Sequence, residues 1–302
     1  MKRASNKLHQ GVLNICEYCL VPLRTINFNQ AKTIILLFTI LISTSVFGKE
    51  NTGSDVAETL PQNLELKDEL QTFKVTTTHY NGDIFGNFFN KQQVYGEYTR
   101  GLPNGKVKWN NVTLATSMSM GRDAEFPEGV SINYMEDFTY HPDGNMIKKE
   151  KLESFTEHSA FTKNLIWDML AIESFAWANW NELKLNEPYS NPEMNGKVDL
   201  AGQGYFENKD IQLTYTGISL RNGERCATIE YRTMNNPLEV NYEGMDMKGR
   251  SHYWGTIWVS LEDKQIEHAV LFEDVILEMV LPGQTQKTIM NATREISFVK
   301  VI

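Results

Sequence analysis

The sequence predicts a mainly β (α+β) fold: a curved antiparallel half-barrel sheet wrapped around one central helix. Apolar and polar residues alternate along most of the chain after Gln71, which indicates half-buried strands. Tight-turn sequences such as Asn222-Gly223 separate these segments, and short connections favour antiparallel neighbours. The alternation stops between about residues 155 and 184, where a helical pattern takes over.

Strand patterns lie on both sides of that helix. The clearest segments are Thr72–Tyr80, Gln93–Thr99, Val112–Met120, Val130–Tyr140, Ile211–Leu220, Arg225–Thr233, Lys248–Leu261, Gln265–Leu281 and Gln286–Ile302. We expect about ten to twelve strands in all. Several segments exceed the usual length of about five or six residues, and long strands are typical of strongly curved sheets and barrels.

The central helix is apolar over an unusually wide arc. Ser154 and Glu157 have the spacing of a capping box at its start. Asn164–Trp180 holds 12 apolar residues in 17, too short a run for the roughly 20 residues that cross a bilayer. A helix of this kind has to be buried on more than one side.

The strand Ile266–Leu281 is apolar on both faces, although a half-buried strand has one polar face. We expect the helix to cover its concave side at Val270, Phe272 and Ile276, and an apolar ligand to cover the remainder. The predicted ligand-binding residues are Ile166, Leu170, Trp177, Trp254, Trp258, Phe272 and Ile276. The alternative is that these residues form ordinary core.

Residues 1–48 have the pattern of an N-terminal extension and a signal peptide, with an apolar run at 33–47. This run is shorter than a membrane-spanning helix, which favours cleavage after Gly48 over retention as an anchor. We expect secretion across the inner membrane to the periplasm or the exterior, with no permanent membrane span in the mature chain. Residues 49–70 are predicted to be a flexible acidic lead-in, and residues 71–302 a single domain.

After cleavage the chain has 24 basic and 37 acidic side chains, a net charge of −13. Such a protein is a poor nucleic-acid binder, and anionic membrane surfaces repel it. Cys226 is the only cysteine left, which excludes an intramolecular disulfide and favours a small buried residue.

No catalytic motif, metal-ligand spacing or cofactor motif is present, and we expect no enzyme activity, metal or cofactor. Glu273 and Asp274 are adjacent in an apolar strand, so one of them points to the concave side. That carboxylate either has a raised pKa and acts as an acid or base, or it marks a strand end or a bulge or pairs with an arginine. Asp168 and Glu173 on the helix mark the expected solvent edge of a groove.

The element order, with the closing segment from CATIEYR through YWGTIWVSLEDKQIEHAVLFEDV, resembles the LolA/LppX-like lipoprotein and lipid carriers. The resemblance covers about residues 71–302 and has no short motif, so no residue role is transferred. It implies an unclosed β-barrel whose concave side holds helices, with acyl chains carried between helix and sheet. This chain has one long helix pattern where those carriers often have several.

Three hypotheses follow. The leading one is a non-catalytic envelope protein that binds an acyl chain or lipid between the helix and the concave sheet. The second is a structural or protein-interaction module of the cell envelope, with a filled core and an envelope protein as partner. The third is a secreted hydrolase that uses Glu273 or Asp274. An apolar cavity distinguishes the first from the second, and clustered titratable groups in a cleft distinguish the third.

Overall fold

The computed structural model describes residues 59–121, 124–156, 158–200, 202–242, 245–280 and 285–301. Residues 54–302 form one compact unit. The predicted extension and signal peptide at 1–48 lie outside the described residues, as does the first part of the predicted lead-in.

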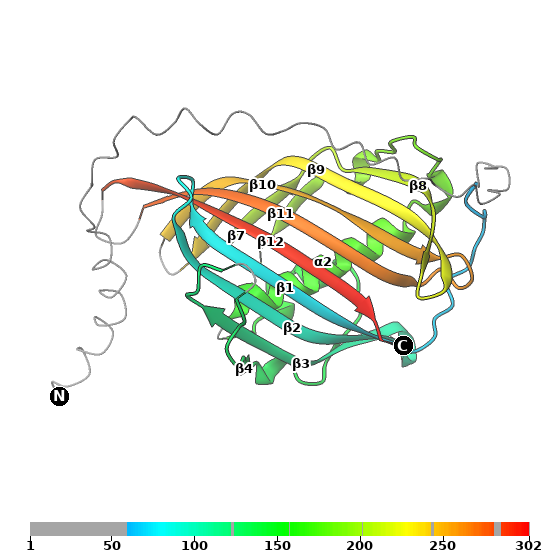
Figure 1. Cartoon of the computed structure of the whole chain (residues 1–302), viewed down its shortest axis with the longest axis horizontal. Coiled ribbons are helices and arrows are strands. Elements are labelled where there is room, and N and C mark those ends of the chain that lie inside the picture. The colour runs from blue at the N-terminus through cyan, green and yellow to red at the C-terminus, as the bar shows by residue number, and fades with distance from the viewer. Residues whose placement is uncertain are drawn as a thin grey trace, which may run out of the picture. The chain divides into compact units, whose positions relative to one another are not determined.

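Twelve strands form one antiparallel sheet, which confirms the predicted fold class and strand number. Their order is β4-β3-β2-β1-β12-β11-β10-β9-β7-β6, with β5 beside β3 and β8 beside β9. The end strands β4 and β6 do not pair, so the sheet is open and curves around the helix (Figure 1). The strands are β1 (Gln71–Asp83), β2 (Phe88–Leu102), β3 (Lys106–Ser117), β4 (Val130–Ser131), β5 (Phe138–Tyr140), β6 (Gly196–Asp199), β7 (Gly204–Asn208), β8 (Gln212–Arg221), β9 (Glu224–Tyr242), β10 (Met245–Ser260), β11 (Ile266–Val280) and β12 (Lys287–Lys300).

The first and last long strands, β1 and β12, join the two halves of the sheet. They pair from Phe73 opposite Lys300 to Asp83 opposite Met290. On the concave face the rings of Phe73 and Phe298 stack with centroids 4.1 Å apart, and both side chains are buried. Aromatic burial of this kind holds the two halves together more strongly than backbone pairing alone would.

The helix α2 (Ser159–Trp177) lies across the concave side of the sheet (Figure 1). It is shorter than the predicted span of about 155–184. It begins after His158, whose φ of 59° is left-handed and whose side chain caps nothing, so the predicted capping box does not start the helix. Five short 3₁₀ turns flank it: η2 (Asn133–Met135), η3 (Gly144–Ile147), η4 (Lys149–Lys151), η5 (Trp180–Glu182) and η6 (Pro192–Met194), while η1 (Pro103–Gly105) lies in the β2–β3 turn.

One apolar side of α2 packs in the main core, and another faces a cavity. Leu165, Ile166, Met169 and Ile172 are at most 1% exposed and belong to the main core. Leu170, Ala171 and Trp177 are only partly buried and face a cavity. Among the described residues, no helix is both long enough and apolar enough to cross a membrane.

The described part of the predicted lead-in, residues 59–70, packs on the domain. Leu60 is 3% exposed and belongs to the core. The indole Nε1 of Trp180 donates to the carbonyl of Pro61 at 3.0 Å, and the Lys67 amide donates to the carbonyl of Asp263 at 2.9 Å. One buried leucine and these hydrogen bonds attach the otherwise polar segment 59–70 to the domain, and its flexibility stays a prediction.

Candidate functional site

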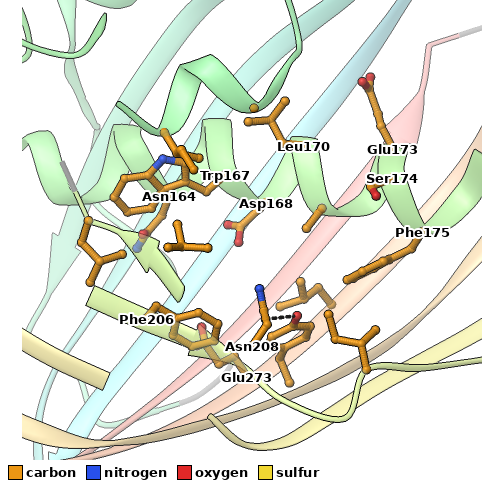
Figure 2. A pocket seen from close by; sticks show the side chains of 18 of the residues that line it. Asn164, Trp167, Asp168, Leu170, Glu173, Ser174, Phe175, Phe206, Asn208 and Glu273 are labelled. Carbon is orange, nitrogen blue, oxygen red and sulfur yellow. Dashed lines mark hydrogen bonds between the residues drawn. The ribbon is translucent and has the colours of Figure 1, made fainter. Parts of the chain in front are cut away.

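A cavity of about 970 Å³ lies between α2 and the concave face of the sheet. Its walls are mainly apolar and come from α2, from β6 and β7, and from β9 to β12. Representative lining residues are Leu170, Phe175, Phe206, Leu238, Leu271 and Val275. Figure 2 shows the helix side chains on one side and Phe206, Asn208 and Glu273 opposite them. This volume is near the top of the roughly 300–1,000 Å³ range of small-molecule sites.

The lining of the cavity also includes Asp143, Gly144 and Gln203. Asp143 and Gly144 are exposed, and Gln203 is half-buried. Asp143 accepts a hydrogen bond from the amide of Asn145 at 2.8 Å and thereby caps η3. The lining thus includes exposed polar groups, although it is mainly apolar.

Three of the predicted ligand-binding residues are on α2. Leu170 and Trp177 line the cavity. Trp177 is fixed there by a 2.9 Å bond from its Nε1 to the carbonyl of Lys264. Ile166 is 0% exposed and lies in the core.

The other four predicted ligand-binding residues lie on the convex face of β10 and β11, away from the cavity. Trp254 is 44% exposed, Phe272 is 37% exposed, and their rings stack with centroids 6.1 Å apart. Ile276 follows Phe272 in the same alternation, and Trp258 packs on His268 with ring centroids 5.0 Å apart.

This placement corrects the expectation that Phe272 and Ile276 face the helix. The residues of β11 that line the cavity are Leu271, Glu273 and Val275. Because side chains alternate, a shift of one residue exchanges the two faces of a strand. Both faces of β11 are apolar, so the hydrophobic pattern alone could not select the inner one.

A buried ionic cluster joins α2 to the floor of the cavity. Arg294 of β12 makes two bonds to Asp168 of α2, at 2.9 and 3.0 Å, and a further one to Glu273 of β11. Glu273 also accepts a 2.5 Å bond from the hydroxyl of Ser251. The exposed fractions of the Arg294, Asp168 and Glu273 side chains are 11%, 12% and 10%. Asp168 is thus an anchor of the helix, not the solvent edge of a groove.

Strand register brings these residues together. His79 is opposite Arg294, Arg294 is opposite Glu273, and Glu273 is opposite Tyr253, in one row across β1, β12, β11 and β10. Burial raises the pKa of Asp168, and the charge of Arg294 opposes that shift. Burial alone would lower the pKa of Arg294, but the carboxylates of Asp168 and Glu273 raise it overall.

A second ionic pair lies further along α2. Arg100 Nε is 3.6 Å from the Oε1 of Glu173, which also accepts a 2.8 Å bond from the hydroxyl of Tyr98. The Arg100 guanidinium lies over the ring of Trp177, 4.2 Å from its centroid. Glu173 is 7% exposed, so it does not mark a solvent edge either. Burial raises its pKa, and Arg100 opposes that shift.

His79 lines the cavity as a neutral group. Burial lowers the pKa of His79 to about 3, with a further contribution from the charge of Arg294. Its ring meets the ring of Phe161 edge-on, with centroids 5.1 Å apart. Neither His79 Nε2 nor the Nε1 of Trp167 has a hydrogen-bond partner among the described residues. Sequence reasoning singled out Glu273 but missed the row as a unit, since its members come from four separate strands.

The carboxylate pair of the hydrolase hypothesis is split between the two faces. Glu273 lines the cavity and pairs with an arginine, as the second interpretation of this residue predicts. Asp274 accepts a 2.5 Å bond from the amide nitrogen of Asn291. Cys226 is buried in β9, and burial raises the pKa of its thiol to about 12.

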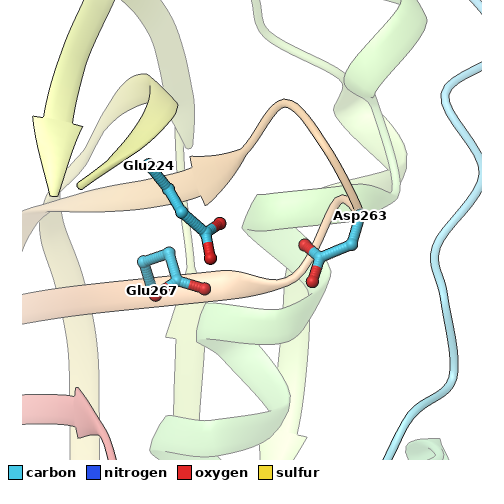
Figure 3. Close-up of side chains that lie close together, drawn as sticks. All are labelled: Glu224, Asp263 and Glu267. Atoms are coloured by element: carbon cyan, nitrogen blue, oxygen red, sulfur yellow. The ribbon is translucent and has the colours of Figure 1, made fainter. Parts of the chain in front are cut away.

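Three carboxylates gather elsewhere, near the β10–β11 turn: Glu224, Asp263 and Glu267 (Figure 3). Their oxygens lie within 4.8 Å of one another. Lys300 pairs with Glu267 and lies 3.9 Å from Glu224, so a lysine of the chain itself balances part of this charge. We assign no metal-binding role to the cluster.

Comparisons with known proteins do not assign the chain to a family. No family model matches the chain, and no curated protein matches it. A lipovitellin structure, titled for its lipid–protein interactions, matches 79% of this chain and 25% of its own at a TM-score of 0.39 and 9% identity. A DUF1329 family protein from Desulfovibrio piger matches 77% of this chain and 86% of its own at a TM-score of 0.14 and 9% identity. The chain spans about a quarter of the lipovitellin chain, and both scores are too low to support an argument about function.

Proposed function

We propose that this protein binds an apolar ligand, an acyl chain or a lipid, between α2 and the concave sheet, without covalent chemistry. The observation that carries the proposal is the mainly apolar cavity of about 970 Å³. A filled core would have no such space, because protein interiors are close-packed with few voids larger than a water molecule. Burial of apolar ligand surface is favourable by roughly 25 cal/mol per Å² before the costs of association.

Two buried ion pairs fix the position of α2 over the cavity. The bidentate Arg294–Asp168 contact and the Arg100–Glu173 pair hold α2 across the opening of the sheet. Buried ion pairs of this kind fix a unique arrangement more than they add stability. They support a cavity that keeps its shape whether or not a ligand is bound.

The hydrolase hypothesis has less support. Glu273 is bound by Arg294 and Ser251, and these contacts hold its carboxylate in a buried ion pair. We propose that the protein is not an enzyme acting through this pair. The interaction-module alternative has one specific observation in its favour, the exposed stacked pair of Trp254 and Phe272 on the convex face.

The compartment is also a proposal. The apolar run at 33–47 supports secretion, and the acidic charge supports a soluble envelope protein. N-terminal sequencing of the protein isolated from its source tests this directly. A mature chain beginning at Lys49 supports cleavage, and an intact N-terminus contradicts it.

The experiment that tests binding uses two matched variants. Leu170→Glu puts a charge inside the cavity, and Phe272→Glu puts the same charge on the convex face of the adjoining sheet. Native mass spectrometry of the protein isolated from its source should show a stoichiometric adduct of lipid mass. We expect Leu170→Glu to lose the adduct and Phe272→Glu to keep it.

A clean mass without adduct, with no uptake of added fatty acid or phospholipid, would contradict ligand binding. If only the Phe272→Glu variant lost the adduct, the ligand would bind on the convex face and not in the cavity. Circular dichroism of both variants excludes unfolding as the cause.

A further inference from the structure

Two buried nitrogens of the cavity lining lack a hydrogen-bond partner. Among the described residues, neither the Nε2 of His79 nor the Nε1 of Trp167 makes a hydrogen bond. Both residues line the cavity, His79 from β1 of the sheet and Trp167 from α2 (Figure 2). His79 as a whole is 7% exposed. Because a buried polar group without a partner is costly, these two atoms point to a polar group of a ligand that pairs with them.

The chemistry of the two nitrogens restricts what that group can be. The indole Nε1 of Trp167 only donates, so its partner has to be an acceptor. His79 is neutral at pH 7, because burial lowers its pKa to about 3. The Nε2 of a neutral imidazole donates in one tautomer and accepts in the other. A carbonyl oxygen can accept from both nitrogens, and a hydroxyl can accept from the indole while it suits either tautomer of the histidine.

The cations that line the cavity are already balanced by carboxylates. Arg100 and Arg294 are the only arginines or lysines among its described lining residues. The Nε of Arg100 makes no hydrogen bond, but it lies 3.6 Å from the Oε1 of Glu173, which balances its charge. Arg294 contacts both Asp168 and Glu273. A charged ligand group would therefore be buried without a counter-ion or would compete with an existing ion pair. An uncharged oxygen avoids both costs.

We propose that His79 Nε2 and Trp167 Nε1 bind an uncharged oxygen of the ligand, that of a hydroxyl or of an ester carbonyl. This inference rests on the binding function proposed above and adds the class of polar group and its place in the cavity. The ring of His79 packs on Phe161 in the first turn of α2, which places the oxygen toward that end of the helix. The apolar chain extends along α2 toward Phe175, which also lines the cavity.

The test compares four probes of the same chain length at pH 7: octanol, methyl octanoate, 1-chlorooctane and octanoate. 1-Chlorooctane has no oxygen, and octanoate is charged. The full chain is delipidated, and displacement of the neutral fluorescent probe N-phenyl-1-naphthylamine gives the Kd of each compound. The variants are His79→Phe and Trp167→Phe, and the matched controls on the convex face are His268→Phe and Trp254→Phe.

For each protein, the affinity for octanol or methyl octanoate is divided by the affinity for 1-chlorooctane, so that general changes in the cavity cancel. We expect His79→Phe and Trp167→Phe each to lower this ratio roughly two- to tenfold, the range that one hydrogen bond between neutral groups supplies. The larger loss, for octanol or for the ester, identifies the oxygen as a hydroxyl or a carbonyl. Both controls should keep the wild-type ratios, and octanoate should bind more weakly than methyl octanoate.

Several results would overturn the inference. Ratios that neither His79→Phe nor Trp167→Phe changes would contradict the oxygen site and leave the binding function in place. Tighter binding of octanoate than of methyl octanoate would show that the cavity prefers a charged group. An equal loss in His268→Phe would attribute the effect to the fold as a whole. Failure of all four probes to bind the wild type would contradict the binding function itself.

Discussion

The concave and convex faces of β11 are both apolar, yet they differ in how far their side chains are buried. On the concave face Leu271 is 3% exposed and lies beside the buried Glu273. On the convex face Phe272 is 37% exposed and contacts only its neighbour Trp254 among the rings described. The concave face is covered by α2, and the convex face has no such cover in the described structure. Hydrophobicity therefore does not distinguish the face that lines the cavity, whereas burial together with paired charge does.

The largest expected effect comes from removing Arg294, the cation that pairs with two carboxylates on the concave face. Arg294→Met leaves Asp168 and Glu273 buried without their partner, which should reduce the free energy of unfolding by about 3–5 kcal/mol. Urea denaturation at pH 7 measures it. The deficit should shrink at lower pH as Asp168, whose pKa burial raises, becomes protonated. A loss under 1 kcal/mol would show that the cluster is solvated.

The next effect concerns the acid stability of the same row. The native pKa of His79 is about 3, against 6.5 for an unperturbed histidine. The unfolded chain therefore binds a proton first, and stability is lost as pH falls from about 6.5 toward 3, at up to about 1.4 kcal/mol per pH unit. His79→Phe should remove about 2–3 kcal/mol of this loss between pH 6 and pH 4.

The convex-face histidine provides the control for that experiment. His268 packs on Trp258, and burial, followed by the charge of Arg221, lowers its pKa as well. It is half-buried, so His268→Phe should change the acid sensitivity less than His79→Phe does. Unfolding free energies of both variants, measured at pH 7, 5 and 4, test this difference in acid sensitivity. Equal changes would mean that the two faces are equally desolvated.

A third prediction compares adjacent residues on the two faces directly. Leu271→Ala should cost about 2–3 kcal/mol, the lower part of the range for core leucines, because Leu271 borders a cavity. Phe272→Ala should cost about 1 kcal/mol, mostly from its stacking on Trp254. The midpoints of urea unfolding measure the difference in stability between the two variants. A larger cost for Phe272 would indicate that a partner or a second copy covers the convex face.

The smallest expected effect is that of a convex-face ion pair. Lys287 and Glu278 form a 2.6 Å contact, but their side chains are 64% and 46% exposed. Lys287→Met should therefore change stability by less than about 1 kcal/mol, in contrast to Arg294→Met. The same urea titration measures it, at low and at moderate salt. A cost comparable to that of Arg294 would contradict the view that burial sets the difference between the faces.

Much of the architecture is predictable from local pattern. Most of the alternating segments carry their strand signal in their own residues, and turns such as Asn222-Gly223 fix antiparallel pairing. The segment Val130–Tyr140, predicted as one strand, is instead β4 and β5 with η2 between them. The wide apolar arc of α2 correctly indicates burial on more than one side. Its start was misjudged because the spacing of Ser154 and Glu157 imitates a cap, whereas the chain turns into the helix at His158 with a φ of 59°.

The sequence by itself determined the antiparallel strands, the central helix α2 and the candidate residues Leu170 and Trp177 on it. The tertiary structure alone decided which face of β11 is inside, because a strand apolar on both faces carries no signal for its orientation. It also decided that Asp168 meets Glu273 and Arg294, which both lie over 100 residues further along the chain. Long-range register created that contact, and no local pattern of residues records it.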